Sequence, residues 1–146
     1  LSGGGRRGAV TLFWLGASRY GEDRDPVAVM ERLRAEGHVT TDDVRRLALV
    51  HAFSAAIGNI DAHLGNYALT IGEQGEVALA PFYDVLPMAF APRHDELPDA
   101  RVTRFAAPGS PAVRALVDDL AGRVRADADA ALDPALVRAW TAHLGA

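Results

Sequence analysis

Residues 59–66 of the chain read NIDAHLGN, and residues 81–84 read PFYD. Between them lie two short apolar runs, residues 67–71 and 77–80, joined by the letters GEQGE. Two such runs around a short glycine-containing connection are typical of a β-hairpin. Because a hairpin brings the chain back on itself, we expect the end of PFYD to lie close to the end of NIDAHLGN.

Two elements are predicted near the N-terminus. Residues 9–15, AVTLFWL, have the β-branched and aromatic content of a strand, although a short buried helix fits them too. Asp25-Pro26 suits the start of a helix, because aspartate caps free N–H groups and proline needs no partner at the first helical position. Gly37 suits the end of that helix.

The helix that leads into NIDAHLGN is predicted to start at Thr40 or Thr41 and to end at Gly58. A threonine hydroxyl can cap the first free N–H groups, and the two aspartates that follow complement the helix dipole. From Leu47 onward the helix is apolar nearly all round, so we expect it to be buried.

Two further helices are predicted after a proline-rich loop over residues 87–109. Ser110-Pro111 would cap the first helix and Asp133-Pro134 the second. The apolar stripe of the first comprises Val113, Leu116, Val117, Leu120 and Val124. The sequence therefore predicts a single domain over residues 1–146, mainly α with a small β-hairpin (α+β), after a flexible Gly/Arg-rich start at residues 1–8.

Some aromatic and histidine residues are assigned structural roles. We expect Trp14 and Trp140 in the core, His51 in or near the core, and Phe82 and Tyr83 packed so that they hold the backbone of Asp84.

Composition limits the classes of function. The chain has 146 residues and a net charge of −4, which disfavours binding to nucleic acid or to an anionic membrane. The absence of cysteine excludes disulfides and thiolate metal sites. No apolar run approaches the ~20 residues that a membrane span needs. We therefore expect a cytoplasmic protein, with no membrane and no direct nucleic-acid contact by this segment.

Three polar residues suit phosphoryl transfer. This reaction depends mainly on positioning and on neutralisation of charge. One carboxylate must orient the attacking hydroxyl and accept its proton, and hard oxygen donors must hold Mg²⁺ against the phosphates. An aspartate, an asparagine five residues later and an aspartate beyond the hairpin supply these groups, so Asp61, Asn66 and Asp84 are the candidate site residues.

The pattern Asp61-x-His63-x-x-Asn66 followed by Tyr83-Asp84 resembles the C-terminal lobe of HipA-like serine/threonine kinases, which are bacterial toxin–antitoxin kinases and their relatives. In that family the first pattern forms the catalytic loop, and Tyr-Asp replaces the Asp-Phe-Gly metal motif of other protein kinases. The resemblance implies a protein-kinase-like C-lobe with ATP and Mg²⁺ as cofactors. Asp61 would be the catalytic base, and Asn66 and Asp84 would bind the metal. His63 could contact phosphate or order the loop by hydrogen bonding, and we expect loop ordering rather than catalysis.

The resemblance is best over residues 42–87, and it does not include the N-terminal lobe of a kinase. Every basic residue of the chain is arginine, whereas a kinase N-lobe uses a lysine to hold ATP phosphates. Residues 3–10 match the letters of a glycine-rich phosphate loop, but no strand leads into them. We therefore expect a chain that is incomplete alone, with the missing lobe, a protein substrate and an antitoxin or DNA-binding protein as partners.

Other interpretations of these residues stay open. Asp61, Asn66 and Asp84 could cap backbone groups, as Asx side chains often do. Related patterns occur in phosphatidylinositol kinases and aminoglycoside phosphotransferases, which would change the substrate class. A metal-dependent phosphohydrolase would use Asp61, His63 and Asp84 as ligands and prefer Mn²⁺ or Zn²⁺. A degenerate lobe would be a non-catalytic regulatory module.

Overall fold

The computed structural model describes residues 8–21, 25–91, 109–127, 138 and 142. The chain divides into two compact units, Leu1–Ala48 with Ala62–Asp84, and Leu49–Asp61 with Val85–Ala146. Helix α3 (Thr41–Ala56) contributes its first half to one unit and its second half to the other. Helices together with one antiparallel sheet confirm the predicted α+β class.

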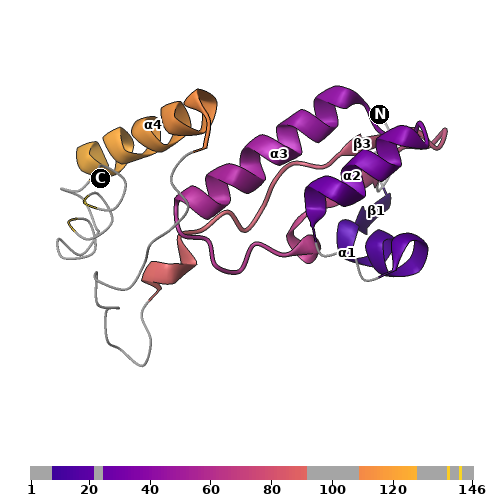
Figure 1. Cartoon of the computed structure of the whole chain (residues 1–146), viewed down its shortest axis with the longest axis horizontal. Coiled ribbons are helices and arrows are strands. Elements are labelled where there is room, and N and C mark those ends of the chain that lie inside the picture. Colours follow the sequence, from indigo (N-terminus) through magenta and orange to yellow (C-terminus); the bar gives the residue numbers. More distant parts are fainter. Residues whose placement is uncertain (1–7, 22–24, 92–108, 128–137, 139–141, 143–146) are drawn as a thin grey trace, which may run out of the picture. The chain divides into compact units, whose positions relative to one another are not determined.

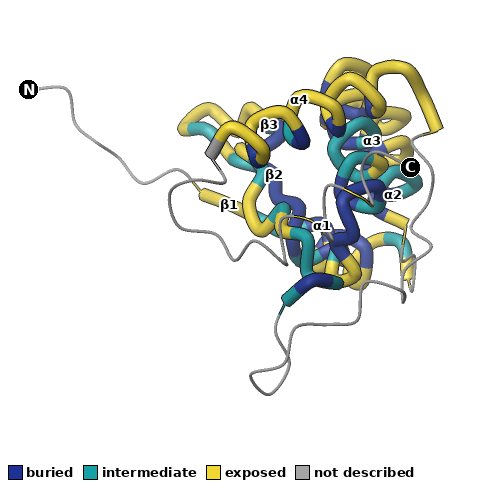
Figure 2. The backbone as a smooth tube through the Cα atoms, turned by 90° about the vertical axis from the view of Figure 1, so that its left-hand side faces the viewer, coloured by how far each residue is buried: buried dark blue, intermediate teal, exposed yellow. Residues whose placement is uncertain are grey.

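The first unit combines a small sheet with short helices (Figure 1). Its elements besides α3 are β1 (Gly8–Thr11), α1 (Leu12–Leu15), a π-helical segment (Gly16–Tyr20), α2 (Pro26–Ala35), a 3₁₀ turn (Leu64–Asn66), β2 (Ala68–Ile71) and β3 (Val77–Leu79). The strands lie in the order β1-β2-β3, and both pairings are antiparallel. Figure 2 shows β2 as the buried centre of the sheet and β1 as its more exposed edge.

The predicted hairpin is confirmed as β2 and β3. Leu69 pairs with Leu79 and Ile71 with Val77, so residues 72–76 form the connection. Both predicted alternatives occur within residues 9–15: strand β1 ends at Thr11, and helix α1 follows directly. The Thr11 hydroxyl accepts a 3.4 Å hydrogen bond from the Trp14 amide, which caps the new helix.

The two predicted helix starts in this unit are also confirmed. Asp25 Oδ1 accepts a hydrogen bond from the Val27 amide at 2.9 Å, and Pro26 is the first residue of α2. At α3, Thr40 and Asp43 cap each other: the Asp43 amide donates to Thr40 Oγ1 at 3.1 Å, and the Thr40 amide donates to Asp43 Oδ2 at 3.0 Å.

Asp43 is a buried carboxylate at the start of α3. Burial on its own would raise its pKa, but the Thr40 hydroxyl and amide, the Leu79 backbone and the charge of Arg46 together bring the pKa below 3.8. The Leu79 bond joins the first turn of α3 to strand β3, so this cap also fixes the helix against the hairpin.

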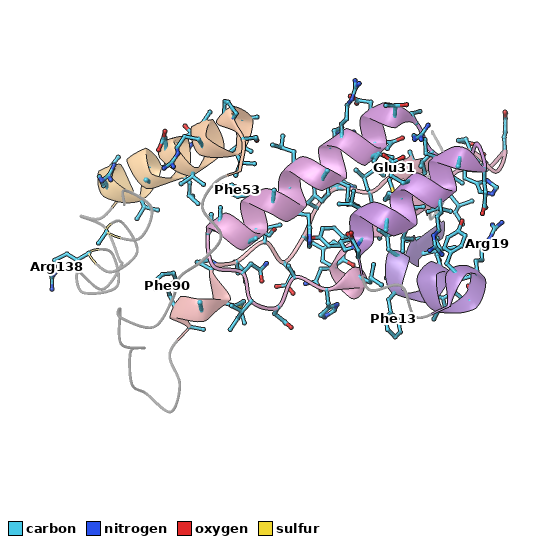
Figure 3. All side chains as sticks on the ribbon, in the orientation of Figure 1. Phe13, Arg19, Glu31, Phe53, Phe90 and Arg138 are labelled. Carbon is cyan, nitrogen blue, oxygen red and sulfur yellow. The ribbon has the colours of Figure 1, made fainter. Side chains whose placement is uncertain are left out.

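The core of the first unit lies between the sheet, α1, α2 and the start of α3. Its buried residues are Leu12, Leu15, Val29, Met30, Leu33, Val39, Val44, Leu47, Leu64, Tyr67, Leu69 and Leu79. The prediction that Trp14 belongs to the core was wrong, because Trp14 is 61% exposed. Leu12 and Leu15 fill the inner face of the single turn of α1, which directs Trp14 and its neighbour Phe13 outward, as Figure 3 shows for Phe13.

The second unit begins with the C-terminal half of α3, where only Ala52 is exposed between Leu49 and Gly58. The expectation for His51 is met, since its side chain is half-buried. The amides of Gly58 and Asn59 donate to the carbonyls of Ala55 and Ser54 at 3.2 and 2.9 Å, which satisfies the last carbonyls of the helix. Gly58 has a φ of 83°, a conformation that favours glycine, so the predicted stop is confirmed.

Helix α4 (Pro111–Asp127) and a 3₁₀ turn (Met88–Phe90) complete the described part of this unit. The Ser110 hydroxyl accepts from the Val113 amide at 3.3 Å, as predicted for a cap. Within α4, the buried residues are Val113, Val117, Ala121 and Val124. The first three belong to a hydrophobic cluster, and Leu120 packs against it. The assignment of Leu116 to the stripe was wrong: it is 39% exposed, and Ala121 takes the inner place instead.

Some sequence predictions lie outside the described residues. They concern the flexible start at residues 1–8 apart from Gly8, most of the loop over 87–109, most of the helix after Asp133-Pro134, and Trp140.

Candidate functional site

The ends of the hairpin bring two of the predicted site residues together within the first unit. Beyond the ladder of β2 and β3, the Ala80 amide donates to the Ala68 carbonyl at 2.9 Å, which carries the pairing toward the open end of the hairpin. Asn66 lies just before β2 and Asp84 a few residues after β3. The amide Nδ2 of Asn66 donates to Asp84 Oδ2 at 2.9 Å, so the proximity expected from the hairpin is observed.

Asn66 is the buried member of this pair. It is 6% exposed and closes the 3₁₀ turn Leu64–Asn66, whose last amide bonds to the His63 carbonyl at 2.9 Å. Because a carboxylate only accepts hydrogen bonds, the nitrogen of the amide must face Asp84 and the oxygen must face elsewhere. That oxygen, Asn66 Oδ1, is buried and has no hydrogen-bond partner.

An unpartnered buried amide oxygen is uncommon, since leaving one costs about 1–3 kcal/mol. It is a hard oxygen donor, and this is the ligand type that Mg²⁺ and Mn²⁺ take from proteins. The oxygens of Asn66 and Asp84 are therefore of the chemical type that a small divalent cation takes.

Asp84 has an unusual backbone. Its φ is 57°, the one positive φ of a non-glycine residue in the described part of the chain. The left-handed region costs an ordinary residue roughly 1–2 kcal/mol, and aspartate less, because its short side chain can bond locally. Backbone strain of this kind collects at functional sites. In Asp84, this backbone conformation accompanies a carboxylate that points toward Asn66.

The two aromatic residues before Asp84 each contact a residue that precedes β2. The Phe82 ring lies edge-on to the buried ring of Tyr67, with centroids 6.4 Å apart. The Tyr83 side chain is exposed, and its hydroxyl donates to the carbonyl of Gly65 at 2.6 Å. Phe82 thus packs inward, as expected, while Tyr83 is bonded to the turn that carries Asn66. Sequence reasoning missed this bond, because it joins residues that lie 18 positions apart and has no local sequence signal.

His63 orders the loop in the structure. It is exposed and stands at the start of the 3₁₀ turn, where its Nδ1 accepts a hydrogen bond from the Gly65 amide at 2.9 Å. An accepting Nδ1 has its lone pair occupied, which leaves it unable to bind a metal at that nitrogen. Among the described residues there is no group of three or more His, Asp and Glu side chains arranged to hold a metal ion. The bond at Nδ1 limits His63 to its Nε2 as a metal ligand.

Asp61 belongs to the second unit. Its side chain is exposed, and its amide donates to Oδ1 of Asn59 at 3.1 Å. Asn59 is itself buried, and this turn fixes the backbone of Asp61 directly after the end of α3. Sequence reasoning gave Asn59 no role, although an asparagine two residues before an aspartate is a signal for such a turn.

Comparison with known proteins identifies the family. A family model described as the HipA-like C-terminal domain matches residues 11–138. The chain belongs to this family. The match includes the hairpin, the Asn66–Asp84 pair and Asp61, so the resemblance noticed in the sequence is confirmed.

A curated relative of this HipA-like chain is "Toxin YjjJ" of Escherichia coli strain K12. The two are 40% identical over 63 residues, which is 43% of this chain and 14% of the relative. The chain therefore spans far less than two thirds of that toxin. No solved structure matches the chain. In the part of the HipA-like chain that the structure describes, no helix is long and apolar enough to cross a membrane.

Proposed function

We propose that this chain supplies the catalytic and metal-binding residues of a HipA-type serine/threonine kinase, which transfers the γ-phosphoryl group of ATP to a protein hydroxyl. The observation that carries the proposal is the Asn66–Asp84 pair, in which a buried amide with an unpartnered oxygen bonds a carboxylate held in a strained turn. Membership of the HipA-like family supports the reaction class.

Asn66 and Asp84 would hold Mg²⁺ in this proposal. An ion that keeps several of its waters needs only one or two protein ligands beside the phosphate oxygens of ATP. When bound, it would neutralise the charge that develops on the transferred phosphoryl group. The protein's part is to keep the two oxygens in place, and the buried position of Asn66 serves that purpose.

Asp61 would act as the base. It would orient the hydroxyl of the substrate serine or threonine and take its proton while the new oxygen–phosphorus bond forms and the bond to the β-phosphate oxygen breaks. The exposure of its carboxylate makes it accessible to a protein substrate, and the Asn59 bond holds its backbone without using the side chain.

The fold and the partners are part of the same proposal. The α+β arrangement suits the C-terminal lobe of a kinase, and a second lobe would supply the phosphate-binding loop and the lysine that this chain lacks. The name of the E. coli relative supports a toxin–antitoxin setting, with an antitoxin or DNA-binding protein and a protein substrate as partners.

The experiment is a transfer assay with γ-labelled ATP and Mg²⁺, using the full-length natural protein that carries this chain and a pool of serine- and threonine-containing peptides. Asp61→Asn should lower kcat by about 10³-fold, since a positioned base contributes roughly 10²–10⁴-fold. Asp118→Asn is the matched control, because it makes the same change at an exposed position of α4. Transfer unaffected by Asp61→Asn, or release of free phosphate without transfer, would contradict the proposal.

A further inference from the structure

Both polar groups of the Gly65 backbone are bonded to side chains. Its amide donates to Nδ1 of His63 at 2.9 Å, and its carbonyl accepts from the hydroxyl of Tyr83 at 2.6 Å. His63 precedes β2 and Tyr83 follows β3, so the two side chains come from the two chain segments that flank the hairpin. Gly65 is therefore held from two directions, directly before Asn66.

The space around Gly65 fits this arrangement closely. A Cβ atom at this position would lie 2.6 Å from Cε1 and 2.9 Å from Nδ1 of His63. Real Cβ atoms essentially never approach so near, so a residue with a Cβ atom at this position would force the imidazole of His63 to shift. The glycine and the histidine thus form a matched pair, although the sequence motif alone suggests no contact between them.

Two parallel links join the same two segments. The first is the hydrogen bond from Tyr83 to Gly65. The second joins the residues that follow them, Asp84 and Asn66. The first link limits how the 3₁₀ turn can rotate, and this rotation decides where the amide of Asn66 points. Because Tyr83 and His63 are exposed, their bonding groups could equally bond water, so these bonds select an orientation more than they stabilise the fold.

We propose that His63 and Tyr83 are positioning residues, which hold the peptide of Gly65 so that Asn66 presents its amide to Asp84 and to the metal. This inference rests on the proposed function of Asn66 and Asp84. It gives His63 a role through its Nδ1 acceptor, and it makes the hydroxyl of Tyr83, rather than its ring, the important part of that residue.

The test uses the full chain and Mn²⁺ alone. Nuclear magnetic resonance would follow amide exchange at Gly65 and the paramagnetic broadening of Asn66 and Asp84, while the signal of free Mn²⁺ in electron paramagnetic resonance gives the Kd. Tyr83→Phe and His63→Ala should each raise the Kd about tenfold, the usual effect of losing a residue that orients a ligand. His63→Ala should also speed exchange of the Gly65 amide.

Two variants separate positioning from general damage. His63→Asn puts an amide oxygen where Nδ1 lies, so it should restore both the protection of Gly65 and the wild-type Kd. Tyr20→Phe removes a tyrosine hydroxyl from the π-helical segment, outside the site, and should leave the Kd unchanged. Circular dichroism at the assay temperature verifies that every variant is folded.

The outcomes distinguish the two proposals. Wild-type Mn²⁺ binding at Asn66 and Asp84 with unchanged Kd values in Tyr83→Phe and His63→Ala would overturn the positioning role and leave the metal site standing. A failure of His63→Asn to restore binding would overturn the role of the Nδ1 acceptor. No broadening at Asn66 and Asp84 in the wild type would overturn the metal site and the inference that depends on it.

Discussion

Asp84 combines an unfavourable backbone conformation with a favourable side-chain contact. Its φ of 57° would suit glycine better, yet glycine could not accept the hydrogen bond from Asn66. Asparagine tolerates the same left-handed conformation and keeps an oxygen acceptor. The two residues differ at this position mainly in charge, so the exchange isolates what the negative charge does.

We therefore expect Asp84→Asn to fold as well as the wild type and to bind Mn²⁺ at least about tenfold more weakly, because the cation loses its charged ligand. Thermal unfolding and Mn²⁺ titration of the same samples provide the two measurements. Asp118→Asn, the control with the same loss of charge on α4, should bind as the wild type does. A Tm lowered by several degrees in Asp84→Asn would mean that the carboxylate serves the fold instead.

At the scale of elements, the start of α3 carries several polar bonds on one side chain, that of Asp43. Asp43 accepts from the hydroxyl and amide of Thr40 and bonds the backbone of Leu79, so one carboxylate ties a helix cap to a strand. Its charged form is favoured in the folded chain, because the bonds and Arg46 outweigh the cost of burial.

Stability should depend on pH through Asp43. Because its pKa is lower in the folded chain than the usual 3.8, its contribution is fully present above pH 3.8 and is lost as the pH falls through the folded-state pKa. Asp43→Asn should lower the free energy of unfolding by about 1 kcal/mol at pH 7. In acid the difference from the wild type should be smaller, because Asp43 of the wild type is then protonated as well. Urea unfolding across pH measures both, with Asp42→Asn on the exposed side of the same turn as control. An equal loss at every pH would contradict this reading of the cap.

The sequence predicted those elements whose signals are local. Asp25-Pro26, Thr40 and Gly58 mark helix ends through bonds to residues a few positions away, and each was found where expected. The pairing of strand β1 was harder to predict, because its partner β2 lies far from it in the sequence. Within the site, the meeting of Asn66 and Asp84 followed from the hairpin. The bond from Tyr83 to Gly65 and the positive φ at Asp84 were not predicted, because neither has a local sequence signal.

On the scale of the whole molecule, each unit has a hydrophobic cluster of its own. The cluster of the second unit comprises Ala56, Ile57, Val113, Val117 and Ala121, with Leu49, Phe53, Val85 and Leu120 packed against it. Its buried members are two alanines, two valines and one isoleucine, so its stability depends on their close packing. Such a cluster tolerates little loss of volume.

Val117→Ala should therefore destabilise the second unit by about 2 kcal/mol, from lost burial and the cavity left behind. Its neighbour Leu116 offers a matched control, because Leu116→Ala removes a larger side chain from the exposed face of the same helix turn. Hydrogen exchange should become faster across α4 in the first variant and stay nearly unchanged in the second. Equal effects would show that the inner and outer faces of α4 had been assigned wrongly.

The outward direction of Trp14 affects how unfolding of this protein can be observed. An indole that already lies in water in the native state emits at nearly the wavelength it has in the unfolded chain. Intrinsic fluorescence from Trp14 is thus a poor monitor of melting in the first unit, but it is well placed to report anything that comes to cover α1, because such an event would shift its emission toward the blue.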